Sequence, residues 1–311
     1  NQCVGTTSHS ISVLQAPNIS VTATEDTICI GNSSNLIANG ASSYIWTPSS
    51  SLNINTIAVV SATPTATTIY SVLGTDINNC SSTSLVTINV NPLPILNVIP
   101  LISTICVGDS LVMMANGAQD FIWSPALSLN TTIGPNIIAT PITNSFYTIT
   151  GTDINGCSDI ISTIINVNPK PIITLSPSSA DICEGASVSI SSFGADSYVW
   201  SPAFGLNSTT NSSVIANPNA TTNYTVLGTD FNNCTNTTNF QLNVGINPIV
   251  AITPENPIIC EGGNISLTAS GANQYIWKPI TGLSAGVGIM VSASPNVSTT
   301  YTLVATDSIG C

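Results

Sequence analysis

The sequence contains very few charged residues. Only 5% of its 311 residues are charged, against roughly 25% in an ordinary soluble domain. Lys170 and Lys278 are the only cations, and 14 acidic residues bring the formal net charge to −12. Because no cluster of Lys or Arg can neutralise a run of phosphates, the composition excludes nucleic-acid binding. It excludes attachment to an anionic membrane through a polybasic segment for the same reason.

Long hydrophobic runs are also missing. Hydrophobic residues make up 43% of the chain, which is too many for a disordered protein. Pro, Asn, Ser or Thr interrupts them every few positions, so no run reaches the roughly 18 residues that a membrane-spanning helix needs. No membrane insertion is expected. No signal peptide is visible, because Asn1 opens in the middle of a repeat, so we interpret the chain as a segment of a longer protein.

Histidine is almost absent, which limits the chemistry available. His9 is the only one, so no repeated unit contains a Ser-His or Cys-His pair for nucleophilic catalysis. The acidic residues form no recurring close pair of the glycosidase kind. Zinc would require further His or closely spaced Cys residues. The sequence therefore predicts no catalytic residues and no enzyme.

The chain consists instead of a repeat of 77 residues. This step separates successive members of three sets of residues, which are Trp46, Trp123, Trp200 and Trp277; Tyr70, Tyr147, Tyr224 and Tyr301; and Asp76, Asp153, Asp230 and Asp307. A fixed period of this kind indicates tandem domains. Asn/Pro-rich linkers, such as Asn91-Pro92, separate the repeats. The predicted boundaries are 1–16 (the last strand of a preceding repeat, since Cys3 matches Cys80), 17–93, 94–170, 171–247 and 248–311 (which lacks its final strand).

Within a repeat the hydrophobic period is two, which predicts strands. The segment 187–191 alternates polar and apolar residues, and Asn155-Gly156 is typical of a tight hairpin turn. About seven short strands in each repeat favour an all-β fold, a tandem array of small antiparallel immunoglobulin-like sandwiches. The four Trp residues, on the presumed third strand, and the four Tyr residues, which open the sixth, are predicted to be core residues rather than ligand-binding ones.

Nine cysteines alternate at steps of 26 and 51 residues, which indicates disulfides and an extracellular location. Pairing within repeats would give Cys29–Cys80, Cys106–Cys157, Cys183–Cys234 and Cys260–Cys311. These positions fall at opposite ends of an immunoglobulin-like sandwich, about 20 Å apart, whereas a disulfide tolerates Cα separations of about 4.4–6.8 Å. Pairing between repeats is therefore favoured, and the alternative stays open. It gives Cys29–Cys157, Cys106–Cys234 and Cys183–Cys311, and leaves Cys3, Cys80 and Cys260 to pair outside this chain segment.

Oxygen-rich turns offer one candidate metal site. Asp76, Asp153 and Asp230 each precede an Asn by two residues, and such pairs can hold Ca²⁺. Asx residues before a hairpin usually serve the turn itself. No cofactor is expected other than this calcium candidate.

The repeat motif resembles a known family. Examples are Ile182-Cys183-Glu184-Gly185, Tyr198-Val199-Trp200-Ser201-Pro202 and Tyr224-Thr225-Val226-Leu227-Gly228-Thr229-Asp230. Nearly the whole chain resembles PKD-like/immunoglobulin-like tandem repeats of large Bacteroidota cell-surface proteins, similar to SprB-like gliding adhesins exported by type IX secretion. This resemblance implies O-glycosylation at Asp-Ser/Thr followed by an aliphatic residue, which fits Thr27, Ser110 and Ser308.

These observations predict an extracellular structural or adhesive protein, forming a rod, stalk or filament on a bacterial surface. Its expected partners are copies of itself, through head-to-tail repeats or lateral contacts that an uncharged surface permits, and surfaces or glycans. The alternatives are an array of polysaccharide-binding modules and a spacer in a secreted hydrolase.

Overall fold

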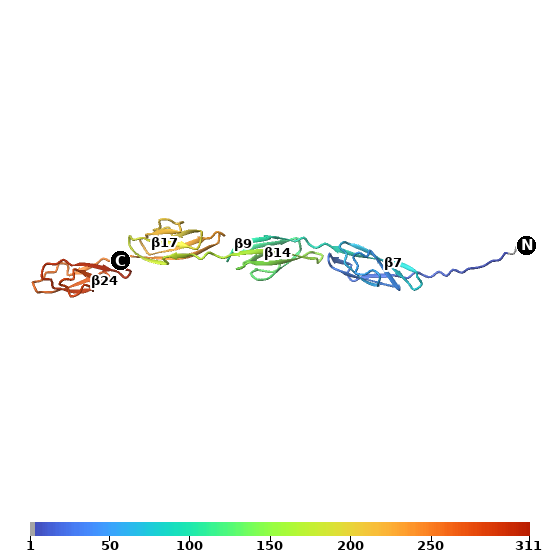
Figure 1. Cartoon of the computed structure of the whole chain (residues 1–311), viewed down its shortest axis with the longest axis horizontal. Coiled ribbons are helices and arrows are strands. Elements are labelled where there is room, and N and C mark those ends of the chain that lie inside the picture. Colours follow the sequence, from blue (N-terminus) through green and yellow to red (C-terminus); the bar gives the residue numbers. More distant parts are fainter. Residues whose placement is uncertain (1–3) are drawn as a thin grey trace. The chain divides into compact units, whose positions relative to one another are not determined.

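The computed structural model describes residues 4–311, and this part of the chain is all-β, with 26 strands and no helix. No segment of it is therefore a helix capable of crossing a membrane. The chain divides into two compact units, Asn1–Val167 and Asn168–Cys311. Each unit contains two β-sandwiches, and each sandwich has a hydrophobic core of its own (Figure 1). The residues of the four cores lie within 17–93, 94–170, 171–247 and 248–311 respectively.

Repeat 1 has seven strands in two sheets. They are β1 (Ser20–Ala23), β2 (Thr27–Cys29), β3 (Ser34–Asn39), β4 (Ser43–Thr47), β5 (Val59–Ala62), β6 (Thr68–Thr75) and β7 (Ser81–Asn91). One sheet has the order β1-β3-β5 and the other β2-β7-β6-β4. Every pairing is antiparallel except that of β2 with β7. Two facing sheets with this order form an immunoglobulin-like sandwich, which confirms the predicted fold class.

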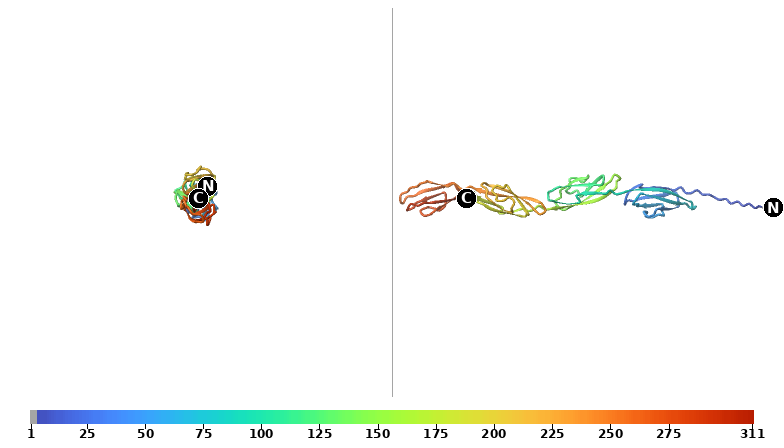
Figure 2. Two further views of the ribbon diagram at one scale, coloured as in Figure 1. Left: turned by 90° about the vertical axis from the view of Figure 1, so that its left-hand side faces the viewer. Right: turned by 90° about the horizontal axis from the view of Figure 1, so that it is seen from above.

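Repeats 2 and 3 have the same architecture, which Figure 2 shows from a second side. The strands of repeat 2 are β8 (Asn97–Ile99), β9 (Ile102–Cys106), β10 (Leu111–Asn116), β11 (Asp120–Ser124), β12 (Asn136–Ala139), β13 (Ser145–Thr152) and β14 (Ser158–Asn168). Those of repeat 3 are β15 (Thr174–Ser176), β16 (Ser179–Cys183), β17 (Val188–Phe193), β18 (Ser197–Ser201), β19 (Ser213–Ala216), β20 (Thr222–Thr229) and β21 (Thr235–Gly245).

The first strand of each complete repeat is divided between the two sheets. In repeat 1, β1 pairs with β3, and the chain then crosses to the other sheet, where β2 pairs with β7. The hydroxyl of Ser34, which is buried, donates to the carbonyl oxygen of Glu25 (2.7 Å) and accepts from its N–H (3.1 Å) at this crossing. The Trp therefore lies on the fourth strand, not on the third as the sequence predicted.

Repeat 4 has only five strands within the described residues. They are β22 (Ala251–Thr253), β23 (Ile265–Ser270), β24 (Gln274–Lys278), β25 (Met290–Ala293) and β26 (Thr302–Thr306). The predicted absence of the final strand has a second effect. In repeat 3, β16 pairs with the final strand, β21, and in repeat 4 the residues equivalent to β16, 256–260, form no strand either.

Each core is built around one Trp and one Tyr. All four Trp side chains are at most 2% exposed, and their indole N–H groups donate to backbone carbonyls, as Trp123 Nε1 does to Gly134 O (2.9 Å). Tyr70, Tyr147 and Tyr224 are also fully buried. Tyr301 differs, since it is only partly buried at the edge of its core. In repeat 3, Phe240 of β21 lies opposite the equivalent Tyr224, and the part of repeat 4 that the structure describes has no such strand.

Candidate functional site at the repeat junctions

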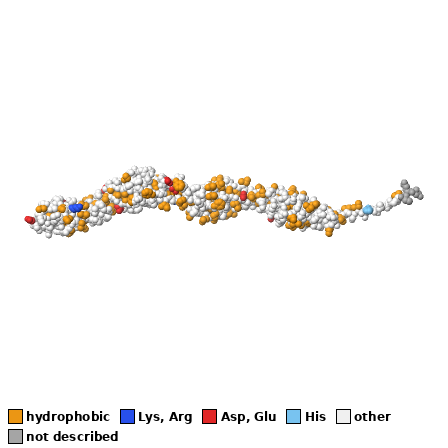
Figure 3. Space-filling model, viewed as in Figure 1, with side chains coloured by type: hydrophobic (Ala, Val, Ile, Leu, Met, Phe, Trp, Pro, Cys, Tyr) orange, Lys and Arg blue, Asp and Glu red, His pale blue; other side chains and the backbone are white. Residues whose placement is uncertain are grey.

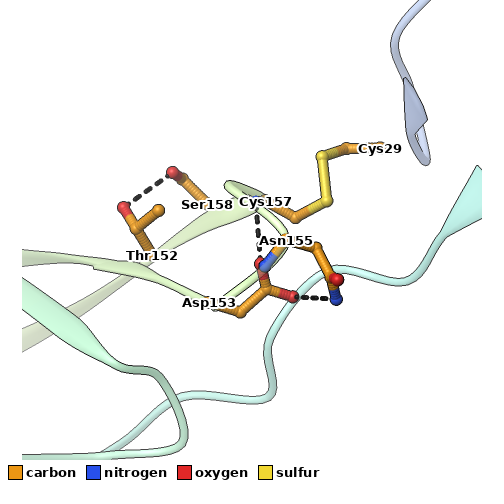
Figure 4. Close-up of a disulfide and its surroundings, with 6 residues drawn as sticks. All are labelled: Cys29, Thr152, Asp153, Asn155, Cys157 and Ser158. Carbon is orange, nitrogen blue, oxygen red and sulfur yellow. Dashed lines mark hydrogen bonds between the residues drawn. A yellow bond between two sulfur atoms is a disulfide. The ribbon is translucent and has the colours of Figure 1, made fainter. Parts of the chain in front are cut away.

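The hairpin that precedes the last strand is held by one aspartate. Asp153 Oδ1 accepts the backbone N–H groups of Asn155 (2.9 Å) and Cys157 (2.8 Å), and the side chains of Thr152 and Ser158 bond across the hairpin at 2.9 Å (Figure 4). Gly156 adopts the left-handed φ of 78° that this turn requires. The turn thereby fixes the direction in which the backbone of Cys157 leaves it.

This hairpin of repeat 2 is bonded to repeat 1. Cys157, which is completely buried, forms a disulfide with Cys29 at the end of β2, with a Cα–Cα distance of 5.5 Å (Figure 4). The N–H of Ile30 donates to Asn91 O (2.9 Å), which holds the end of β2 against the end of β7. The first two repeats are thus joined both by their linker and by a covalent bond between side chains.

The second unit contains the same junction between repeats 3 and 4. Cys183, at the end of β16, forms a disulfide with Cys311, again with a Cα–Cα distance of 5.5 Å. Asp307 Oδ1 accepts the N–H groups of Ile309 (3.0 Å) and Cys311 (2.8 Å), as Asp153 does in repeat 2. Both bonds belong to the inter-repeat scheme that the sequence favoured.

The intra-repeat alternative is wrong in this structure. Its four pairs, Cys29–Cys80, Cys106–Cys157, Cys183–Cys234 and Cys260–Cys311, each contain a cysteine that is bonded elsewhere. The reason is geometric. Cys80 precedes the first residue of β7, whereas Cys29 lies opposite its last residue, Asn91. An 11-residue strand places those ends about 33 Å apart.

The remaining cysteines differ in state. Cys106 and Cys234 are disulfide-bonded, and their predicted pairing with each other stays a prediction. Of the cysteines that the structure describes, Cys80 and Cys260 are free. Cys3 lies outside the described residues.

The calcium candidates serve the hairpins. Asp76 and Asp230 accept the same two backbone N–H groups as Asp153, at 2.8–2.9 Å. In residues 4–311, the structure brings together no group of three or more His, Cys, Asp or Glu side chains suited to a metal ion. The Asx turns thus have a structural role in each repeat, and calcium binding stays a prediction.

The three glycosylation candidates are accessible. Thr27 begins β2, Ser110 precedes β10 and Ser308 lies in the last hairpin, and all three are exposed. Thr27 Oγ1 donates to the neighbouring carboxylate of Asp26 (3.1 Å).

Sequence reasoning missed one close contact at the second junction. Gly245 ends β21, where repeats 1 and 2 have Asn91 and Asn168. A Cβ atom on Gly245 would lie 2.7 Å from Ile309 Cγ1 and 2.9 Å from Cys311 Sγ. Ile309 in turn stands where repeat 2 has Asn155. Gly245, which has no side chain, therefore leaves room for the bulkier Ile309. Only an alignment of the repeats with one another could have indicated this contact.

Comparison with known proteins gives fold-level likenesses only. No protein-family model matches the sequence, and no curated protein matches it either. The chain is similar to the N-terminal eight Ig domains of Down syndrome cell adhesion molecule (11% identity, TM-score 0.30), with 94% of this chain covered. It spans only 55% of that structure. It is also similar to a Ca²⁺-stabilised adhesin that helps an Antarctic bacterium bind ice (12% identity, TM-score 0.31), with 96% of each chain covered.

A third likeness is to a bacterial ice-binding adhesin of 1.5 MDa (12% identity, TM-score 0.28), covering 75% of this chain and 100% of that one. Similarity at these values does not establish common function. The immunoglobulin-like assignment rests on the strand order of each repeat.

Proposed function

We propose that this chain is an extracellular structural repeat protein of a bacterial surface, whose tandem sandwiches form the rod or stalk of an adhesin or filament. The observation that supports this most strongly is the pair of disulfides between successive repeats, Cys29–Cys157 and Cys183–Cys311. Disulfides persist in oxidising, extracellular compartments. Their position between cores, rather than within one, suits a protein that must keep its domains connected.

The surface suits lateral contact with other copies. On the outer face of one sheet of repeat 2, Ile122 and Ile160 both lie opposite Thr150, and their side chains are 58% and 65% exposed. In repeat 1, Ile45, the counterpart of Ile122, lies opposite Leu73, and both side chains are exposed. On the face that Figure 3 shows, apolar side chains lie among uncharged ones. Such a surface can be covered by another copy without the cost of burying charge.

The SprB-like family and type IX secretion belong to the same proposal. The test is immunogold electron microscopy of the bacterium that makes the protein, with antibodies against the 311-residue chain. We expect labelled extracellular filaments or stalks whose repeats are spaced by roughly 35–45 Å, the length of a sandwich with strands of about ten residues. Loss of the label when type IX secretion is disabled would support that export route. Label confined to the cytoplasm would overturn the proposal, and tight binding of the isolated chain to a polysaccharide would favour the polysaccharide-binding alternative.

A further inference from the structure

The disulfide between Cys29 and Cys157 closes a large covalent loop. It bonds the end of β2 in repeat 1 to the hairpin before β14 in repeat 2 (Figure 4). Residues 30–156, which include β3 to β7 of repeat 1 and β8 to β13 of repeat 2, lie inside this loop. A pull applied before Cys29 and after Cys157 is therefore carried by the disulfide, and the chain inside the loop bears none of it.

The part of repeat 1 outside the loop runs from one end of the sandwich to the other. Cys29 lies opposite Asn91, the last residue of β7. Ile19 lies at the other end, because a Cβ atom on Gly74 would be 3.0 Å from Ile19 Cγ1, and Gly74 pairs with the second residue of β7. Residues 17–29 thus cross the sandwich once. Fully extended, a segment of this length measures about 45 Å, which is close to the roughly 35–45 Å of the folded sandwich.

In repeat 2 the route beyond the disulfide is a single strand. β14 begins directly after Cys157 and ends at Asn168, where the linker leads through Pro169 and Lys170 into repeat 3. A strand of 11 residues measures about 36 Å. A pull that enters repeat 2 at Cys157 thus leaves it along one strand length, and it passes through none of the strands β8 to β13.

Repeat 3 continues the route in the way that repeat 1 begins it. The carbonyl oxygen of Pro171 accepts a hydrogen bond from Asn236 Nδ2 (2.9 Å), near the start of β21. Cys183 lies opposite the last residue of β21. The segment between Pro171 and Cys183 therefore also crosses its sandwich once, and the second disulfide leads on to repeat 4. Residues 184–310 lie inside the loop that this disulfide closes.

The two loops leave a short covalent route through the chain. From Asn1 to Cys311 it consists only of residues 1–29, residues 157–183 and the two disulfides. These roughly 60 residues measure about 200 Å when fully extended, whereas all 311 residues without disulfides would measure about 1,100 Å. The disulfides thus set the greatest length to which the chain can be stretched.

We propose that this route makes the array a tether that bears tension at a fixed maximum length, because the disulfides carry a pull past the sandwiches. Each crossing has an extended length close to that of the folded sandwich, so unfolding of a sandwich adds little length. Without such bonds, one unfolded repeat of 77 residues would add about 200 Å. The inference rests on the proposed function in one respect, since a rod or stalk at a cell surface is what meets such a pull.

Single-molecule stretching of the full chain, held by peptide tags at its two ends, measures this maximum length. Every protein carries Cys3→Ser, Cys80→Ser and Cys260→Ser, so that only the bonded cysteines remain. Under oxidising conditions we expect the chain to stop lengthening at about 200 Å. After reduction the maximum length should rise about fivefold, in steps that each correspond to the unfolding of one repeat.

Two double variants locate the route. Cys29→Ser/Cys157→Ser should raise the maximum length to at least about 550 Å, whether or not Cys106 and Cys234 pair, because most of repeat 1 then carries the pull. Cys106→Ser/Cys234→Ser is the matched control and should leave the maximum at about 200 Å, because neither residue lies on the route. The fully stretched length depends on the covalent bonds alone, so the comparison holds even if a variant folds poorly.

An oxidised chain that lengthens beyond about 500 Å would overturn the proposal. Equal maximum lengths for the parent chain and Cys29→Ser/Cys157→Ser would also overturn it. Labelling of the bacterial surface tests the proposed function separately. A short maximum length in a protein that is absent from the surface would keep the mechanical inference and remove the proposed function. Labelled surface filaments whose oxidised chain stretches to its full length would do the reverse.

Discussion

Cys29 and Cys157 are 128 residues apart in the sequence, and their Cα atoms are 5.5 Å apart in the structure. They belong to different repeats, and neither lies at the centre of a core. Immunoglobulin domains of antibodies place their disulfide between the two sheets of one sandwich. Here aliphatic residues such as Val72 and Ile149 fill that interior, and the disulfide connects one sandwich to the next.

Peptide mapping without reduction should recover Cys29 joined to Cys157 and Cys183 joined to Cys311. Digestion with pepsin at low pH is suitable, because thiol–disulfide exchange needs the thiolate and is slow in acid. The same map should join Cys106 to Cys234. Recovery of Cys106 joined to Cys157 would contradict the inter-repeat scheme.

Replacing Trp123 by Ala should destabilise repeat 2 by about 3–5 kcal/mol, the usual cost of removing a large buried aromatic side chain. Its neighbour Ile122 is 58% exposed, so Ile122→Ala should change stability by less than about 0.5 kcal/mol. Hydrogen exchange followed by mass spectrometry measures the effect repeat by repeat. Because each repeat has its own core, protection around Trp277 should be unchanged, and a loss of protection in all four repeats would show that they unfold as one.

Replacing Asp153 by Ala should cost repeat 2 about 1.5–3 kcal/mol, because two backbone N–H groups lose a charged acceptor. Asp153→Asn keeps an oxygen at this position and should cost less. The measurement is chemical denaturation of both variants and the parent chain.

Whether the hairpins of Asp76, Asp153 and Asp230 bind Ca²⁺ can be measured by thermal unfolding. Since the turns are held by hydrogen bonds from the backbone, we expect the melting temperature to be the same in millimolar Ca²⁺ and in excess chelator. A rise of several degrees with Ca²⁺ that disappears in Asp153→Asn would instead show that these turns bind the ion.

Repeat 3 should lose stability at alkaline pH through Tyr224. Burial raises the pKa of its phenol above the usual 10.0, and a hydrogen bond with Thr222 opposes this in part. The unfolded chain therefore ionises this group first, so stability falls as the pH rises above about 10. The difference in denaturation midpoint between pH 9 and pH 11 should be smaller in Tyr224→Phe. An equal difference in the two proteins would assign the alkaline loss to other groups.

Protein purified from its natural source should have a mass above that of the bare sequence if Thr27, Ser110 and Ser308, all exposed, carry sugars as predicted. Fragmentation that retains the glycan should place sugars at these residues. An intact mass equal to that of the sequence would remove the glycosylation prediction.

The repeats and their cores could be predicted because the period is long, free of insertions and marked by large residues such as Trp46 and Tyr70. The strands could also be predicted, because apolar and polar residues alternate along them as successive side chains point to opposite faces of the sheet. The division of the first strand was not. Its second half, Thr27–Cys29, has three residues, which is too few for a pattern, and it pairs with residues about 60 positions later in the chain.

At the junctions, only those features could be predicted that depend on the strand order of an immunoglobulin-like sandwich. The cysteine pairs followed from the two ends of a sandwich. The contact between Gly245 and Ile309 did not, because it depends on the packing of one junction. Repeat 4 shows a related limit, since residues 256–260, the equivalents of β16, form no strand and Tyr301 is only partly buried.

The linker around Pro92 and the bond between Cys29 and Cys157 connect the same two sandwiches by separate routes. A protease that cut the linker would leave the two halves attached through sulfur, and a reductant that opened the disulfide would leave them attached through the peptide chain. Both connections must be broken before the sandwiches separate. A single cut at this junction, in the linker or in the disulfide, therefore does not release one sandwich from the other.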